Sequence, residues 1–178
     1  MRSRLPDDRA SEKLRRRQIS VAPHRIAVYL DLENLFYEYR QVAALEAGLA
    51  ELSSFLARLR RRGTVVAAVA ACDRDLQKRV AIELDRLGIR PFRHRGGPDA
   101  ADKQLLDFLR HEVPASCQTV IIGSGDHIFA EEARRLRQSG KRVEVIAPRS
   151  KISAELYKAA DSYEEFALPP ERKSDKIA

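Results

Sequence analysis

Acidic, amide and hydroxyl side chains follow several apolar runs of this sequence, at points where strands would end. These side chains are Asp31 with Asn34, Asp73, Asp102, and Ser124 with Asp126. Oxygen ligands of this kind suit Mg²⁺ or Mn²⁺, and such ions activate water and bind phosphate oxygens. Each of these residues alone is better explained as a helix cap. Their number indicates a cation site, because several carboxylates at one sheet edge repel one another unless a cation lies between them.

Alternating apolar runs and helical patterns predict the elements that would position these side chains. Strands are expected at residues 26–30, 65–72, 89–92, 119–122 and 143–147, and a last segment covers residues 162–166. Helices are expected at residues 45–61, 76–87, 101–112, 127–138 and 153–160. Strands that are apolar throughout are typical of a parallel sheet covered on both faces. The sequence therefore predicts a three-layer, Rossmann-like α/β fold with a central parallel sheet of five or six strands.

Helical geometry separates two carboxylates of one expected helix. Its buried stripe is formed by Leu105, Leu106 and Leu109. At about 100° per residue, Asp102 lies within roughly 20° of the centre of this stripe, whereas Asp107 lies more than about 90° away. Asp102 is therefore expected to point inward and Asp107 to lie in solvent.

The formal charge of +7 over 178 residues is concentrated at the ends of the chain. Residues 1–20 contain seven basic and three acidic side chains, residues 169–178 contain three and two, and the body carries only +2. We expect a basic N-terminal arm over residues 1–24, one domain over residues 25–168 and a charged tail over residues 169–178. Such an arm attracts phosphate, but a solvated tail explains the same composition equally well.

Composition and motifs exclude several classes of protein. No apolar run approaches the roughly 20 residues of a membrane-spanning helix, and no hydrophobic signal segment precedes residue 21. The sequence contains no Gly-Lys-Ser/Thr phosphate loop, no His-Glu-x-x-His zinc motif and no Gly-x-Ser-x-Gly nucleophile motif. Its two cysteines, Cys72 and Cys117, lie in apolar runs, so we expect no disulfide framework and a reducing, cytoplasmic location.

Three segments occur in a characteristic order along the chain. They are Val28–Leu35 with its Asp31-Leu-Glu-Asn34 core, Asp102 at the start of a helix, and Ile121–Asp126 with its Ser124-Gly-Asp126 turn. Together they resemble the NYN domain family of PIN-like ribonucleases, over about residues 25–167. The resemblance implies a PIN-like form of the Rossmann-like fold, an acidic pocket that binds Mg²⁺ or Mn²⁺, and hydrolysis of RNA phosphodiester bonds.

The resemblance also implies roles for single residues. Asp31, Asp102 and Asp126 match the acidic metal ligands and are expected to be catalytic. Asn34 matches the asparagine of the pocket and joins this catalytic set. Ser124 matches the serine of the Ser-Gly-Asp turn, and we expect it to contact RNA.

Ile128 stands where many members of that family have a further carboxylate. Losing one anionic ligand weakens metal affinity and leaves the number of bound ions open. A second hypothesis is therefore a catalytically weak or inactive module that binds RNA or a partner protein. A phosphatase of the haloacid dehalogenase type, suggested by Asp31-Leu-Glu33, ranks last because the second acid of its motif is normally Asp and no suitable lysine is evident.

Arginines at the third expected strand are candidates for holding RNA. Arg90, Arg93 and Arg95 enter the same edge of the sheet as the acids, and guanidinium groups match the geometry of phosphate. A solvated basic loop explains these residues equally well.

Overall fold

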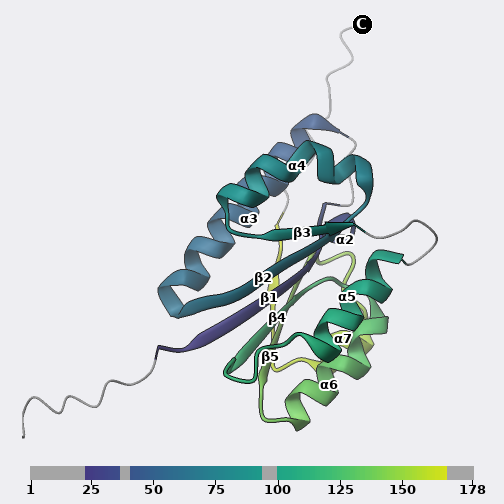
Figure 1. Ribbon diagram of the computed structural model, residues 1–178. Coiled ribbons are helices and arrows are strands. Elements are labelled where there is room, and N and C mark those ends of the chain that lie inside the picture. Colours follow the sequence, from purple (N-terminus) through teal and green to yellow (C-terminus); the bar gives the residue numbers. More distant parts are fainter. Residues whose placement is uncertain (1–22, 37–40, 94–99, 168–178) are drawn as a thin grey trace, which may run out of the picture.

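The computed structural model describes residues 23–36, 41–93 and 100–167, which form a six-stranded sheet between two layers of helices (Figure 1). The strands are β1 (Arg25–Asp31), β2 (Thr64–Cys72), β3 (Arg90–Arg93), β4 (Thr119–Gly123), β5 (Arg142–Ala147) and β6 (Ser162–Glu165). Their order across the sheet is β3-β2-β1-β4-β5-β6, and every neighbouring pair is parallel. The predicted three-layer α/β class is confirmed, with six strands.

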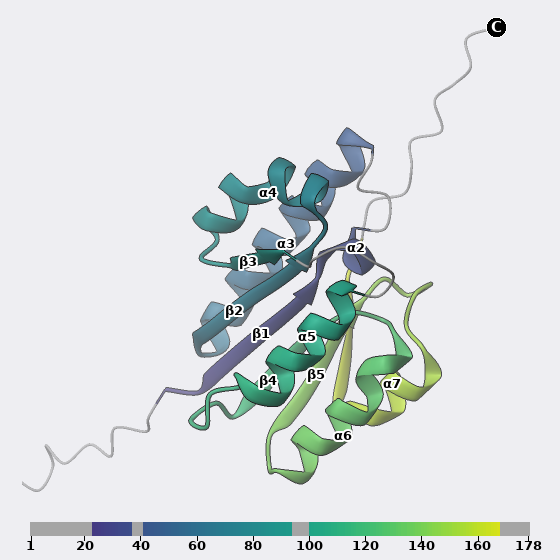
Figure 2. The same ribbon diagram turned by 45° about the vertical axis from the view of Figure 1, so that its right-hand side comes forward.

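Helices cover both faces of the sheet. They are α2 (Leu32–Leu35), α3 (Val42–Arg62), α4 (Arg74–Arg86), α5 (Ala100–His111), the 3₁₀ helix η1 (His127–Phe129), α6 (Ala130–Gln138) and α7 (Ala154–Ala159). Figures 1 and 2 show α3 and α4 over one face and α5, α6 and α7 over the other. Each layer buries its own hydrophobic core against the sheet.

The central strand β1 contributes to both cores, because successive side chains of a strand point to opposite faces. Ile26, Val28 and Leu30 pack in the core beneath α3 and α4. Ala27 and Tyr29 pack in the core beneath α5, α6 and α7. All five are buried, which explains why the sequence of this strand is apolar throughout instead of alternating.

The expected boundaries of strands and helices agree with the structure within three residues, except after β4. Residues 127–138 were expected to form one helix, but the segment begins as η1 and becomes α6 only at Ala130. Asp126 caps this tight turn by accepting a 3.1 Å hydrogen bond from the backbone N–H of Ile128. The sequence also did not predict α2, because four residues are too few to show a helical period.

The order of the strands reverses between β1 and β4. From β1 the chain builds outward to β2 and β3, returns to β4 beside β1, and then builds outward to β5 and β6 on the other side. Open parallel sheets bind ligands at the carboxyl ends of their strands, at such a reversal point. Asp31 ends β1, and Ser124 directly follows β4. The fold therefore places these two predicted site residues at the expected edge.

No helix of the described residues is both long and apolar enough to cross a membrane, and both cysteines of the chain lie among those residues. Cys72 and Cys117 are free and buried, and burial raises the pKa of both thiols, that of Cys72 to about 12. Residues 1–22 of the expected arm, and the expected C-terminal tail, lie outside the described residues.

Candidate active site

Asp31 lies at the carboxyl edge of the sheet, where β1 ends and α2 begins. Its side chain caps α2, because Oδ1 accepts a 3.1 Å hydrogen bond from the backbone N–H of Asn34. Asp31 is only 4% exposed. A carboxylate is unfavourable in such a buried position unless it has partners or a function, so this residue defines the candidate site.

Asp102, in the first turn of α5, faces Asp31 across this edge, and the two side chains hydrogen-bond to each other. Burial, followed by the negative charge of Asp102, raises the pKa of Asp31 to about 8, although the N–H of Asn34 acts in the opposite direction. Two carboxylates this close share a proton near neutral pH unless a cation lies between them. The inward direction predicted for Asp102 is confirmed, and so is the outward direction of Asp107, whose side chain is 74% exposed.

Ser124 holds Asp31 from the side of β4. Its hydroxyl donates to Oδ2 of Asp31 at 3.3 Å, and the same hydroxyl oxygen accepts from the backbone N–H of Asp126 at 3.3 Å. Both carboxylate oxygens of Asp31 therefore have a donor. Ser124 was expected to contact RNA, but its side chain is fully buried. The structure instead gives it the role of positioning Asp31.

Asn34 joins the ends of β1 and β4, because its Oδ1 accepts a 2.9 Å hydrogen bond from the backbone N–H of Gly125. Gly125 is in turn packed against the segment that precedes α7. Its carbonyl accepts a 2.8 Å hydrogen bond from the N–H of Ser153, and a Cβ at this position would lie 2.5 Å from the carbonyl carbon of Lys151. This close approach of two backbones requires glycine and fixes three segments relative to Asp31.

Asp126 lies at the same edge, but its carboxylate is engaged at the start of η1. Oδ1 accepts a hydrogen bond from the N–H of Ile128 and lies 2.9 Å from Nδ1 of His127. Within residues 23–36, 41–93 and 100–167, no three His, Cys, Asp or Glu side chains are grouped closely enough to hold a metal ion. The structure thus brings together Asp31 and Asp102, and the role of Asp126 as a third ligand stays a prediction.

The geometry of this edge can now be compared with known proteins. The family model of the NYN domain matches residues 25–167, which are most of the chain. The chain belongs to the NYN domain family. This family generally comprises nuclease-like ribonucleases.

Comparisons with individual proteins add information on the fold of this NYN domain. No curated protein matches the chain. Among solved structures, a protein of unknown function from Vibrio parahaemolyticus is similar, with a TM-score of 0.64 and 21% sequence identity. The match covers 83% of this chain and 96% of that chain. At this level of identity the likeness shows a shared fold.

Of the three arginines expected to hold RNA, only Arg90 has a described side chain in the NYN domain. It forms a 3.1 Å ion pair with Glu112, and its Cζ lies 5.3 Å from the centroid of the Phe108 ring. Both partners lie toward the end of α5 that is far from the acidic pair, so the structure does not bring Arg90 to that pair. The side chains of Arg93 and Arg95 lie outside the described residues.

Asp73, the acid that follows β2, is a helix cap. Its Oδ1 accepts a 2.6 Å hydrogen bond from the N–H of Leu76 in the first turn of α4. Such a bond satisfies one of the backbone donors that a helix start leaves unpaired. The interpretation as a helix cap is therefore correct for Asp73. Asp31 both caps a helix and pairs with the carboxyl group of Asp102.

Sequence reasoning did not place the segment before α7 at the candidate site. Lys151 and Ser153 meet Gly125, and Ser153 also caps α7 by accepting a 3.2 Å hydrogen bond from the N–H of Leu156. The signals present in the sequence were a glycine between two polar residues and a serine before a helix. Neither signal identifies the segment that it contacts, because that depends on the three-dimensional path of the chain.

Proposed function

We propose that this NYN domain is a metal-dependent endoribonuclease that hydrolyses RNA phosphodiester bonds at the edge formed by β1 and β4. The observation that carries the proposal is the pairing of the buried carboxylate of Asp31 with the half-buried carboxylate of Asp102. Two facing carboxylates repel each other when ionised, and a divalent cation relieves that repulsion by using both as ligands. Membership of a family of nuclease-like ribonucleases supports this class of reaction.

The oxygen donors of the acidic pair are of the kind that a hard divalent cation prefers. Asp31 and Asp102 would hold Mg²⁺ or Mn²⁺, which both favour carboxylate oxygens, and Asp126 would contribute from the turn after β4. When bound, such an ion stabilises negative charge on phosphate and lowers the pKa of water. The family points to RNA as the substrate class, and one RNA phosphate would lie at this edge.

Asn34 and Ser124 would orient the carboxylate of Asp31 and would not contact the substrate themselves. The N–H of Asn34 binds one oxygen of Asp31, and the hydroxyl of Ser124 binds the other. The orientation of the carboxylate is therefore fixed before a substrate arrives, which reduces the reorganisation needed for reaction. Both are positioning residues in this proposal.

Cleavage assays with matched variants on α5 test the proposal. The full chain is incubated with a mixture of structured and single-stranded RNA, in Mn²⁺ or in EDTA. We expect cleavage only with the metal, and a loss of at least about 100-fold in Asp102→Asn. Asp107→Asn removes an exposed acid from the same helix and should retain the wild-type rate. Cleavage in EDTA, or equal rates for the two variants, would contradict the proposal.

A second candidate function is RNA binding without cleavage. Two observations favour it: Ile128 packs against the hydrophobic core where family members have a carboxylate, and the Asp126 carboxylate is bonded to the start of η1. A binding module of this kind would bind labelled RNA in EDTA and leave it intact in Mn²⁺. The cleavage assay described above separates the two functions.

A further inference from the structure

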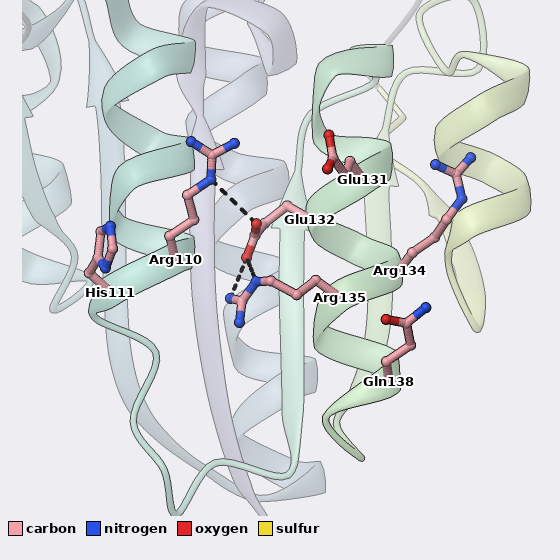
Figure 3. Close-up of a pocket in the computed structure, with 7 residues that line it drawn as sticks. All are labelled: Arg110, His111, Glu131, Glu132, Arg134, Arg135 and Gln138. Carbon is pink, nitrogen blue, oxygen red and sulfur yellow. Dashed lines mark hydrogen bonds and ion pairs between the residues drawn. The ribbon is translucent and has the colours of Figure 1, made fainter.

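A polar pocket of about 730 Å³ lies between α5 and α6, apart from the acidic pair (Figure 3). Its lining includes Arg110 of α5 and, on α6, Glu131, Glu132, Arg134, Arg135 and Gln138. Three arginines and two glutamates are among the lining residues, so positive charge is in excess. Arg110 and Arg135 point toward Glu132, whereas Arg134 extends from the other side of α6 (Figure 3). A second hollow of about 570 Å³ shares Arg134 and Gln138 with the first and adds Arg137, Lys141, Arg142 and Asp161, the last of which pairs with Arg137. Basic residues therefore continue around α6.

The buried carboxylate of Glu132 organises two of the arginines. Its Oε1 accepts a 2.6 Å hydrogen bond from Nε of Arg135, and its Oε2 lies 3.5 Å from Nε of Arg110. Arg135 also donates to the carbonyl of Leu109 at 3.1 Å, which ties α6 to α5. Figure 3 shows no bond from Arg134 to the other lining residues. Glu132 carries one negative charge and has two arginine partners, so part of the positive charge of Arg110 and Arg135 stays uncompensated by Glu132.

Two helices connect this pocket to the acidic pair. α5 carries Asp102 in its first turn, and α6 follows Asp126 through η1, so both helices start at the same edge of the sheet. They run side by side away from that edge (Figure 2). Arg110 comes eight residues after Asp102, which corresponds to about 12 Å along a helix. The pocket thus lies toward the far end of α5, and an RNA strand bound at the acidic pair could reach it with a phosphate a few nucleotides from the cleaved bond.

We propose that this pocket binds backbone phosphates of the RNA strand on one side of the cleaved bond. The inference rests on the proposed ribonuclease function, which supplies the strand. Guanidinium groups bind phosphate oxygens through paired N–H donors, and Glu132 holds two of them in place before binding. The acidic pair repels phosphate, so a basic holding site nearby offsets that repulsion. Phosphate contacts carry no base information, so the pocket accepts RNA of any sequence.

RNA affinity, measured on the full chain in EDTA where cleavage is absent, tests the inference. The variant Arg110→Ala/Arg134→Ala removes two charges and leaves Glu132 paired within α6. The matched control Arg61→Ala/Arg74→Ala removes two exposed arginines from α3 and α4, over the opposite face of the sheet. Fluorescence anisotropy of a labelled single-stranded RNA is recorded over a range of salt concentrations.

We expect the pocket variant to bind RNA about 10-fold more weakly, with a salt dependence of log affinity that is smaller by roughly 0.7 per lost phosphate contact. The control should stay near the wild type, and lysine at both pocket positions should restore most of the salt dependence because the charge is kept. Equal affinity and salt dependence in the pocket variant and the wild type would overturn the inference. That result is expected if the pocket binds an acidic protein and not RNA. Weaker binding without any Mn²⁺-dependent cleavage by the wild type would overturn the ribonuclease proposal and leave the phosphate site standing.

Discussion

The side-chain oxygen of Asn34 accepts a hydrogen bond from the backbone N–H of Gly125, and this bond joins the end of β1 to the turn after β4. The two strands are neighbours at the point where the strand order reverses. The same edge carries the paired carboxylates of Asp31 and Asp102. Asn34 therefore joins the Ser-Gly-Asp turn to the end of β1, together with the bond between Ser124 and Asp31.

Substitution of Asn34 tests this connection. Asn34→Ala leaves the N–H of Gly125 without its partner, so we expect a loss of about 1–2 kcal/mol in the free energy of unfolding. We also expect RNA cleavage to fall about 10- to 100-fold, because an outer partner of the acids is lost. Asn34→Asp keeps an acceptor oxygen and should recover the stability below about pH 4, where the added carboxyl is protonated and does not repel Asp31. Urea unfolding and initial cleavage rates measure both effects, and equal destabilisation by the two substitutions below that pH would contradict this explanation.

Gly125→Ala should destabilise the fold through a backbone collision. The added Cβ would meet the carbonyl of Lys151 and lie 2.9 Å from the nitrogen of Ile152, and neither backbone atom can rotate away. We expect a loss of about 1–3 kcal/mol together with reduced cleavage. Gly140→Ala is the matched control, since its Cβ meets nothing within 4 Å and only its φ of 83° opposes alanine. That control should lose about 1 kcal/mol and keep full cleavage.

The raised pKa of Asp31 predicts a pH dependence of stability in metal-free protein. Folding moves this pKa from 3.8 to about 8, so between these values the folded chain holds a proton that the unfolded chain does not. The contribution of Asp31 is full below pH 4 and is lost as the pH rises toward 8. Asp31→Asn has no carboxyl to ionise at this position. Between pH 5 and 9 its free energy of unfolding should therefore rise, relative to that of the wild type, by on the order of a few kcal/mol. Unfolding in EDTA measures the difference, and a difference that does not change with pH would refute the assignment.

Glu144 predicts the opposite pH dependence. Burial raises its pKa, but hydrogen bonds from Arg62 and Arg142 outweigh burial and bring the pKa below 4.5. Its stabilising contribution is present above pH 4.5 and is lost as the pH falls through the folded pKa. Glu144→Gln should therefore cost about 1–2 kcal/mol at pH 7 and progressively less below pH 4.5. Glu83→Gln, which breaks an exposed pair with Arg86, is the control and should change stability by less than about 0.5 kcal/mol.

The parts of the fold that sequence could predict are those set by burial and local geometry. The apolar run of β1 follows from burial on both faces, and the direction of Asp102 follows from the helical angle between it and the leucines of α5. Asp107, on the same helix, is exposed for the same geometric reason. A pattern within one element therefore determined where both acids point.

The parts that sequence could not predict depend on contacts between distant segments. Ser124 is buried and bonded to Asp31, Arg90 pairs with Glu112, and Gly125 contacts the backbone of Lys151. In each case the residue type was compatible with a functional role, and the packing of another element decided its contacts. Membership of a family indicates which residue types occur at the site, but rotamers and loop paths determine which of them face each other.

The bond between Ser124 and Asp31 also determines when, during synthesis of the chain, this edge of the sheet can form. The two residues are separated by 93 positions in the chain, so they can meet only after β2, α4, β3 and α5 have been synthesised. Contacts of such long sequence separation form late, because a large loop must close first. A nascent chain that has not yet reached β4 lacks half of the edge. Whatever chemistry this edge performs, the growing polypeptide cannot perform it on the ribosome until most of the domain has emerged.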